Sequence, residues 1–172
     1  MVVGLAAIEA GVISKNTHFN CSGDMELGNA TFHCWRKGGH GMMNIISALE
    51  QSCDVFIYEV ALKTGIRKIK DMAHRLGLGD VTGIGLPGEK QGIIPSHEWK
   101  LANQGGVWTP GETVVSSIGQ GYVLATPLQL AVMTARLANG KQAVTPRLVK
   151  SIGDAVPDFK PMDIDPYALA IL

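Results

Sequence analysis

The sequence predicts a mainly α-helical chain with long loops and at most one short strand. Segments 55–64, 66–76 and 127–138 place apolar residues at intervals of three and four, the spacing of one face of an α-helix. Segments 12–41 and 77–100 have no such period and are rich in residues that favour turns. A chain of 172 residues is long enough to form one domain with a hydrophobic core.

Charge and hydropathy argue against several classes of partner. The chain has 15 Lys plus Arg and 15 Asp plus Glu, so its net charge is zero at pH 7. No net field favours nucleic acid or an anionic membrane, and we expect neither as a partner. The longest apolar run, near residues 1–8, is too short to cross a bilayer and lacks the charged leader of a signal peptide. We therefore expect a soluble chain with no membrane span.

The helices of the first half are predicted from their apolar spacing and their ends. Residues 1–10 predict a largely apolar, buried helix that stops at Gly11, a residue suited to the position after a helix C-terminus. Residues 44–51 and 55–64 predict two helices separated by a short turn. Residues 66–76 predict a further helix that pairs with the preceding one.

The last third of the chain contains one strong helix signal. Thr126, Pro127 and Gln129 form a predicted capping box, with Thr126 as N-cap, Pro127 at the first helical position and Gln129 at the third. This helix should run to about Ala138. The remaining predictions are a short strand at 144–149 and a final helix at 167–172.

Three cysteines and one histidine have a spacing that predicts a metal site. Cys21, Cys34, His40 and Cys53 give C-x12-C-x5-H-x12-C, which uses every cysteine in the chain. Three thiolates and an imidazole complete a tetrahedral Zn²⁺ site, and a full set of protein ligands indicates a structural rather than a catalytic ion. Such an ion would tie the loop 12–41 to the turn that carries Cys53.

Two other interpretations of the cysteines remain open. Two of them could form a disulfide with one left over, or all three could be small core residues. The spacing lacks the short C-x2-C of zinc fingers, whereas the odd number of cysteines argues against a pure disulfide framework. His18 and His33 are reserve ligands.

The triplet Ser52-Cys53-Asp54 occupies the predicted turn between two helices. A serine and a carboxylate two residues apart at a helix start can point at the same space, because the first helical turn leaves its N–H groups unpaired. This geometry is typical of a catalytic or binding site. Ser and Asp are also common N-cap residues, and on these three residues alone the N-cap interpretation is favoured.

Several longer motifs change that balance. They are Gly38-Gly39-His40-Gly41, Ser52-Cys53-Asp54-Val55-Phe56-Ile57-Tyr58, Gly83-Ile84-Gly85-Leu86-Pro87-Gly88-Glu89, Ser117-Ile118-Gly119-Gln120-Gly121 and Ala125-Thr126-Pro127-Leu128-Gln129. With these motifs the chain resembles, over nearly its whole length, the transpeptidase domain of class B penicillin-binding proteins, specifically the elongation-type penicillin-binding protein 2. The resemblance implies the helical part of the penicillin-binding/β-lactamase-like fold, which is α/β in the full domain.

Enzymes of this family use three motifs: Ser-x-x-Lys with the nucleophile, a Ser-x-Asn or Ser-x-Asp triplet, and a Lys-[Ser/Thr]-Gly strand. Only the triplet is visible here, because no lysine of the chain has a serine three residues before it. Lys63-Thr64-Gly65 spells the third motif, but it lies where a helix should end, and we assign it to helix termination. We therefore expect residues 1–172 to be a partial transpeptidase domain that starts after Ser-x-x-Lys and ends before Lys-[Ser/Thr]-Gly.

The resemblance implies acyl transfer by the parent enzyme. A serine outside this chain would attack the D-Ala-D-Ala end of a peptidoglycan stem peptide, and β-lactams would acylate the same serine. Ser52 would relay a proton, and Asp54 would orient the lysine or the substrate amide. An ionised Asp accepts hydrogen bonds but donates none, which favours a lysine partner for Asp54. This chain alone should form no acyl-enzyme, because nothing in it supplies an activated nucleophile.

The implied location of the parent is the periplasmic face of the inner membrane, with other cell-wall elongation proteins as partners. A competing hypothesis comes from a different class of protein. It is a zinc-braced binding module without chemistry of its own, in which Ser52 and Asp54 only cap a helix.

Overall fold

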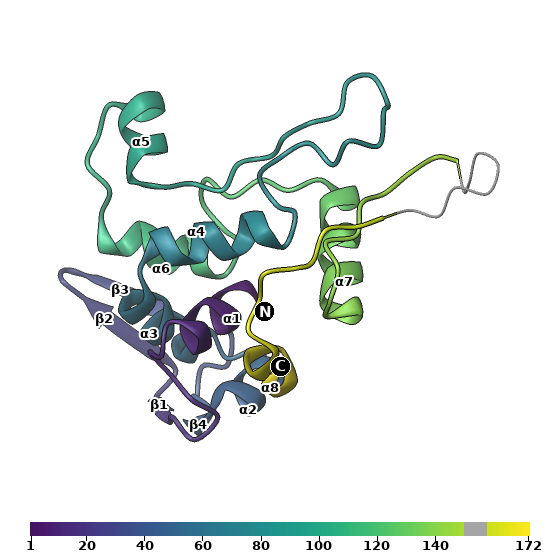
Figure 1. Ribbon diagram of the computed structural model, residues 1–172. Coiled ribbons are helices and arrows are strands. Elements are labelled where there is room, and N and C mark those ends of the chain that lie inside the picture. The colour runs from purple at the N-terminus through teal and green to yellow at the C-terminus, as the bar shows by residue number, and fades with distance from the viewer. Residues whose placement is uncertain (150–157) are drawn as a thin grey trace.

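The helix α1 (Val2–Glu9) lies within the hydrophobic core. In the computed structural model, which describes residues 1–149 and 158–172, α1 packs against α3 (Asp54–Thr64) and α4 (Ile66–Arg75). Every residue of α1 from Val3 to Ile8 is buried, as expected for a helix that is apolar on most sides. Figure 1 shows these helices gathered in one body.

The helix α3 extends from the hydrophobic core to the predicted functional turn. Its Phe56, Val60 and Ala61 are fully buried, and the helix packs against both α1 and α6 (Pro110–Ser117). The helix α2 (Ile45–Glu50) precedes the turn, and Asn44 caps it: the Asn44 side chain accepts a hydrogen bond of 2.9 Å from the Ser47 N–H. The predicted helices on both sides of the turn are therefore confirmed.

The segment predicted as a long loop, 12–41, contains short strands. The strands β1 (Phe19–Cys21) and β4 (Gly41–Met43) pair antiparallel, with Cys21 opposite Gly41. The strands β2 (Asp24–Leu27) and β3 (Ala30–His33) form a hairpin whose turn begins at Gly28, with φ 62°. A glycine with positive φ at the first turn position suits a type II′ hairpin, so Gly28-Asn29 was a usable signal.

Three further helices lie around this body. The helix α5 (His97–Gln104) stands apart at the top of Figure 1, whereas α8 (Pro166–Ile171) packs against α1. The helix α7 (Pro127–Asn139) begins with the predicted capping box, in which the Gln129 N–H donates to Thr126 Oγ1 over 3.1 Å. The predicted helices at both ends of the chain and the capped helix are confirmed, as is the mainly helical fold with only short strands.

Neither α5 nor α6 has the apolar spacing from which the other helices were predicted. The helix α5 has no buried residue, so it has no apolar face to leave a periodic pattern. The sequence signal for the start of α6 is instead a capping box, formed by Thr109 before the helix and Glu112 in its first turn. In the structure the Thr109 N–H donates to Glu112 Oε2 over 2.7 Å. The predicted strand at 144–149 is wrong. These described residues are irregular, and the one bridge nearby pairs Gln142 with Pro161.

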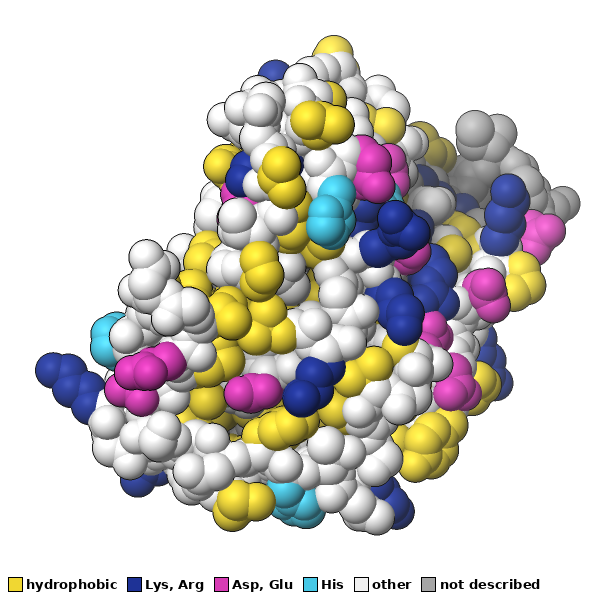
Figure 2. Space-filling view, turned by 90° about the vertical axis from the view of Figure 1, so that its left-hand side faces the viewer, with side chains coloured by type: hydrophobic (Ala, Val, Ile, Leu, Met, Phe, Trp, Pro, Cys, Tyr) yellow, Lys and Arg dark blue, Asp and Glu magenta, His cyan; other side chains and the backbone are white. Residues whose placement is uncertain are grey.

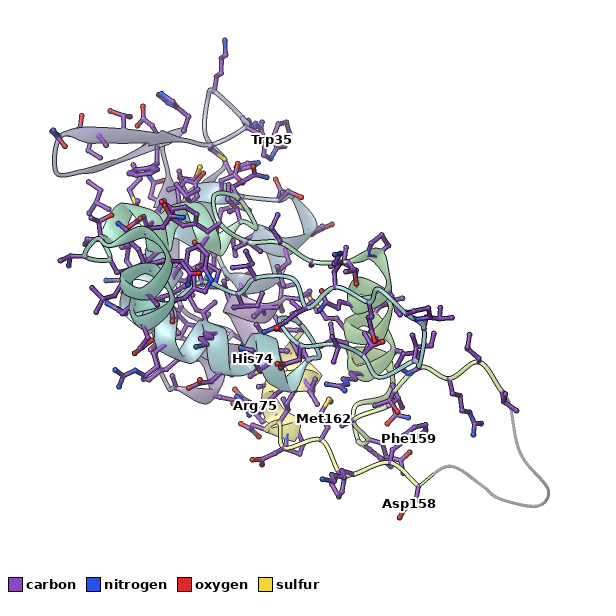
Figure 3. The ribbon with its side chains drawn as sticks, turned by 90° about the horizontal axis from the view of Figure 1, so that it is seen from above. Trp35, His74, Arg75, Asp158, Phe159 and Met162 are labelled. Atoms are coloured by element: carbon purple, nitrogen blue, oxygen red, sulfur yellow. The ribbon has the colours of Figure 1, made fainter. Side chains whose placement is uncertain are left out.

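An ion pair connects the core to the C-terminal segment. The Arg75 guanidinium binds the Glu9 carboxylate at 2.5 Å and also donates to the carbonyl oxygen of Asp163. The Asp165 N–H donates to Glu9 Oε1 over 2.7 Å. Figure 3 shows Arg75 beside this segment near Met162. These charge-assisted bonds hold α8 against α1.

Hydrophobic side chains also reach the surface. On the face shown in Figure 2 they form a band between the lower body and the upper projection, with charges of both signs around them. Among residues 1–149 and 158–172, no helix is both long enough and apolar enough to cross a membrane.

The side chain of Gln129 is fully buried and holds a loop in place. Its Nε2 donates to the carbonyl oxygens of Asp80 at 2.7 Å and Gln91 at 2.8 Å. Its Oε1 accepts from the Thr126 N–H at 2.9 Å. One amide therefore joins both ends of the loop 80–91 to the start of α7.

We expect Gln129→Ala to lower the free energy of unfolding by about 2 to 3 kcal/mol, because the fully buried amide and its hydrogen bonds to two main-chain carbonyls are lost. Urea unfolding at constant m-value measures this change. Gln120→Ala is the matched control, because Gln120 is exposed, and it should change the free energy of unfolding by less than about 0.5 kcal/mol. Equal losses in the two variants would contradict the role given to Gln129.

Candidate functional site

The turn between α2 and α3 holds Ser52 in an uncommon backbone conformation. Ser52 has φ 52°, and among the described residues it is the one non-glycine residue with a positive φ. An L-residue in this left-handed region costs roughly 1–2 kcal/mol, so the turn is held by its surroundings. The Cys53 N–H donates to the Ala48 carbonyl over 2.8 Å and so joins the turn to α2.

Ser52 and Asp54 do not cap the helix. The N-cap of α3 is Cys53, which makes no side-chain capping bond, and Asp54 is the first helical residue. Asp54 Oδ2 instead accepts a hydrogen bond of 2.9 Å from the main-chain N–H of Trp35. The N-cap interpretation of these two side chains is therefore wrong, because a contact from a distant loop uses the carboxylate.

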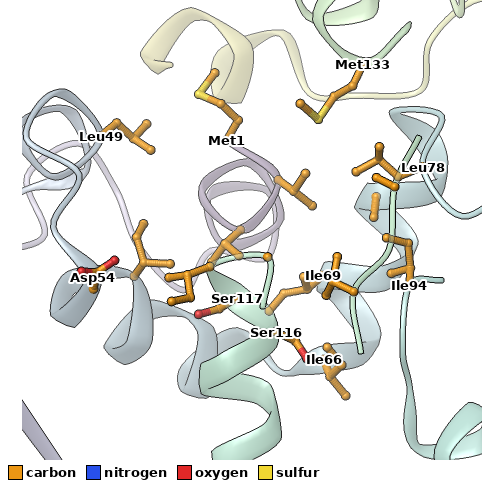
Figure 4. A pocket seen from close by; sticks show the side chains of 18 of the residues that line it. Met1, Leu49, Asp54, Ile66, Ile69, Leu78, Ile94, Ser116, Ser117 and Met133 are labelled. Atoms are coloured by element: carbon orange, nitrogen blue, oxygen red, sulfur yellow. The ribbon is translucent and has the colours of Figure 1, made fainter. Parts of the chain in front are cut away.

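Both residues line a largely apolar cavity of about 560 Å³. Figure 4 shows Asp54 at one side of it, the start of α1 behind it and Ser116 and Ser117 below. Most of the remaining lining is aliphatic, including Leu49, Ile69 and Met133. The polar groups at the rim therefore face a region that can hold an apolar or extended ligand.

The two serines of α6 were not assigned to the site from the sequence. Ser116 and Ser117 lie at the C-terminal end of α6, just before the turn at Gly119, where φ is 78°. In the sequence, Ser117-Ile118-Gly119-Gln120-Gly121 carries part of the family resemblance but gives neither serine a role. The helix that presents these serines could not be predicted from that signal.

The four predicted metal ligands lie together. Their ligand atoms all lie within 4.8 Å of one another. His40 Nδ1 lies 3.5 Å from the Cys34 sulfur and 3.7 Å from the Cys21 sulfur. Strand β1 supplies Cys21, the loop after β3 supplies Cys34, His40 precedes β4, and Cys53 is the N-cap of α3. All three cysteines are buried free thiols, so the disulfide interpretation is not supported. This set, Cys21, Cys34, His40 and Cys53, is called the thiol cluster below.

The electrostatics of the thiol cluster suit a cation. Burial works to raise the pKa of the Cys21 thiol, but hydrogen bonds from the main chain at His40 and Gly23 help to bring that pKa below its ordinary value. Burial raises the pKa of the Cys53 thiol to about 12, and the neighbouring charge of Cys21 and Cys34 adds to this effect. Several thiolates can therefore form together only where a positive ion compensates their repulsion.

The loop around the thiol cluster depends on close main-chain packing. Gly39 has φ 71°, and a Cβ there would collide with the Cys21 carbonyl oxygen. Nε2 of His40 is buried and has no hydrogen-bond partner among the described residues. Nδ1 is therefore the ring nitrogen that faces the sulfurs and that can serve as a ligand.

The tripeptide Lys63-Thr64-Gly65 ends a helix, as predicted. Thr64 is the last residue of α3, and its hydroxyl donates to the Val60 carbonyl oxygen over 2.7 Å. The Lys63 ammonium lies over the Phe19 ring, 5.6 Å from its centre. None of the three residues lines the cavity.

Comparison with known sequences identifies relatives over most of the chain. Residues 1–169 match the family described as penicillin binding protein transpeptidase domain. The peptidoglycan D,D-transpeptidase MrdA of Acinetobacter baumannii is 38% identical over 148 residues, covering 86% of this chain and 21% of that protein. The Escherichia coli protein of that name is 36% identical over 164 residues, covering 92% of this chain and 26% of that protein.

Solved structures agree with the sequence relatives. The crystal structure of Pseudomonas aeruginosa PBP2 in complex with WCK 5153 gives a TM-score of 0.91 at 36% identity, covering 99% of this chain and 39% of that one. PBP2 of Helicobacter pylori in complex with MreC gives 0.89 at 35% identity, covering 99% and 32%. The resemblance to elongation-type penicillin-binding protein 2 is confirmed, and the chain spans a fifth to a quarter of these curated relatives' length.

Tyr58 provides a test of the charges at the start of α3. Burial, and then the negative charges of Asp54 and Cys34, raise the pKa of Tyr58 to about 12. A pKa raised in the folded state contributes stability that is present below about pH 10 and lost as the pH rises through about 12. We expect the tyrosinate absorbance of the wild type, minus that of Tyr58→Phe, to rise near pH 12.

The same difference measured in denaturant is the control for this prediction. There the Tyr58 step should return to about pH 10, the ordinary value for tyrosine. A step near pH 10 in the folded protein would show that the surroundings of Tyr58 are more solvated than the packing indicates.

Proposed function

Because the chain belongs to the penicillin-binding protein transpeptidase family, we propose that it is part of an elongation-type peptidoglycan D,D-transpeptidase. In this proposal residues 1–172 cover the part of the domain between the Ser-x-x-Lys and Lys-[Ser/Thr]-Gly motifs. The observation that carries it is the Ser52-Cys53-Asp54 triplet, whose residues line the rim of the cavity beside α6. The substrate would be the D-Ala-D-Ala end of a stem peptide, and β-lactams would acylate the same nucleophile.

The geometry supports a role for Ser52 in proton transfer. Its side chain is exposed at the cavity rim, and its hydroxyl has no hydrogen-bond partner among the described residues. A hydroxyl can both donate and accept, so it can pass a proton between a neighbouring lysine and a leaving amine. The strained backbone of Ser52 is consistent with such a role, because strain persists where the surroundings enforce a conformation.

Asp54 would orient the lysine of the Ser-x-x-Lys motif. One of its oxygens, Oδ2, is used by the Trp35 N–H, whereas Oδ1 has no hydrogen bond to any described residue. A carboxylate with one oxygen fixed and the other available can accept a bond from a lysine ammonium without rotating away. This arrangement favours the lysine over a substrate carbonyl, to which a carboxylate cannot donate.

We also propose that the thiol cluster binds a structural Zn²⁺. Three sulfurs and one imidazole nitrogen match the complete tetrahedral ligand set of structural zinc. Four protein ligands leave no open position for a substrate, so the ion would stabilise the loop 12–41 and take no part in acyl transfer. The competing hypothesis of a zinc-braced module without chemistry is less supported, because neither Ser52 nor Asp54 caps α3.

The proposed enzyme would act at the periplasmic face of the inner membrane. Other cell-wall elongation proteins are proposed partners, in line with the Helicobacter pylori relative that was solved in complex with MreC.

Metal analysis tests the zinc proposal. Chain purified without added metal should contain about one zinc, with all three thiols protected until a chelator is added. Binding at a hundredfold excess over Kd stabilises by about 2.7 kcal/mol, so chelation should lower Tm by roughly 5–10 °C. Cys21→Ser should lose the metal and His18→Ala should keep it, because His18 is exposed and bonds only to the nearby Asn16 carbonyl. Freely reactive thiols without metal would contradict the proposal.

Penicillin acylation tests the transpeptidase proposal. Residues 1–172 would replace the matching segment of the Pseudomonas aeruginosa relative, giving a complete grafted domain. Fluorescent penicillin should label this domain, and Ser52→Ala should lower the acylation rate about 100-fold or more, the range of general acid–base catalysis. Ser14→Ala is the control, because Ser14 is exposed and does not line the cavity. Residues 1–172 alone should not be labelled. Failure of the unmutated graft to react would argue against the proposed function.

A further inference from the structure

Trp35 contacts both ends of the turn that carries Ser52. Its main-chain N–H donates to Asp54 Oδ2 over 2.9 Å. Its indole Nε1–H donates to the Gln51 carbonyl oxygen over 3.1 Å. Gln51 and Asp54 are the residues immediately before and after Ser52-Cys53. One residue of a separate loop therefore holds the turn from both sides.

The position of Trp35 is not explained by core packing. Its side chain is 65% exposed, and Figure 3 shows it at the edge of the molecule. Burial of an indole is usually the reason for its place in a fold, and here most of the ring faces solvent. What the side chain does contribute is a directed N–H donor to a main-chain oxygen.

The thiol cluster fixes Trp35 in turn. Cys34 immediately precedes Trp35, and the indole meets the His40 ring edge-on, with 5.4 Å between ring centres. Cys53 separates Ser52 from Asp54. The segment 34–35 and the segment 53–54 are thus joined twice, once through the buried sulfurs and once through the Trp35–Asp54 hydrogen bond. Two separate connections restrict the rotation of segment 53–54 relative to segment 34–35 more than a single connection would.

We propose that Trp35 is a positioning residue for acyl transfer. Its two N–H groups hold Asp54 and the left-handed Ser52 in the orientation that the proton transfer requires. This inference rests on the proposed transpeptidase function and adds to it a residue that the reaction uses only indirectly. Trp35 is not proposed to contact the reacting atoms.

The test is Trp35→Phe in the grafted domain, because Phe keeps an aromatic ring and loses the indole N–H. We expect the maximal acylation rate with fluorescent penicillin to fall about 3- to 10-fold, the effect of one hydrogen bond. The concentration of penicillin that gives the half-maximal rate should change by less than twofold. Zinc content should equal that of the unmutated graft, because all four ligands remain.

Trp108→Phe is the matched control. Trp108 also donates through its indole, to Thr113 Oγ1 over 2.8 Å, but this bond does not involve the turn and Trp108 does not line the cavity. Its acylation rate should stay within twofold of the unmutated graft. In a Ser52→Ala background, Trp35→Phe should have no further effect, because the indole N–H acts on the turn through Gln51 and the hydroxyl that it positions is absent.

Three results would overturn the inference. They are an unchanged acylation rate in Trp35→Phe, a loss that accompanies loss of zinc, and a full additional loss in the Ser52→Ala background. Each of them leaves the transpeptidase proposal intact as long as the unmutated graft reacts with penicillin and Ser52→Ala reacts about 100-fold more slowly. Failure of the unmutated graft itself would instead count against the proposed function.

Discussion

The position of Cys53 is the constraint on which the functional turn depends. The residue is both the N-cap of α3 and a member of the thiol cluster, so its thiol is buried at the point where the core helix meets the irregular segment 12–41. The strands of that segment are three or four residues long and form only two-stranded pairs, which are marginal in water. A bound ion would supply the rigidity that so few main-chain hydrogen bonds cannot.

Local signals were enough to predict most helices and the composition of the thiol cluster. Residues such as Thr126 and Gln129 carry their information within one helical turn, and a cysteine's chemistry is evident from its identity. The Trp35–Asp54 bond could not be predicted, because it joins residues 19 apart through a loop whose course depends on the thiol cluster. The exposed helix α5 left no apolar period, and the cavity is formed by side chains of several elements that only the fold brings together.

The cavity and the turn together support the proposed site. Ser52 and Asp54 place polar groups at one side of a largely aliphatic cavity. Hydrogen bonds beside an apolar surface are stronger than in bulk solvent, which would suit the proposed proton relay. The serines of α6 lie on another wall of the same cavity, so the site is assembled from both the first and the last third of the chain.

The buried amide of Gln129 has a consequence for how related chains can differ in length. It donates hydrogen bonds to both ends of the loop 80–91. Within the loop, the Glu89 carboxylate accepts hydrogen bonds from the Thr82 and Gly83 N–H groups. The exposed side chain of Leu86 lies between these anchors. Because loop-closure entropy grows slowly, at about 0.6 kcal/mol for each doubling of length, residues can be inserted near Leu86 without disturbing the ends. The closure of this loop therefore sets little penalty on its length, and the cavity can keep its shape when the loop is lengthened near Leu86.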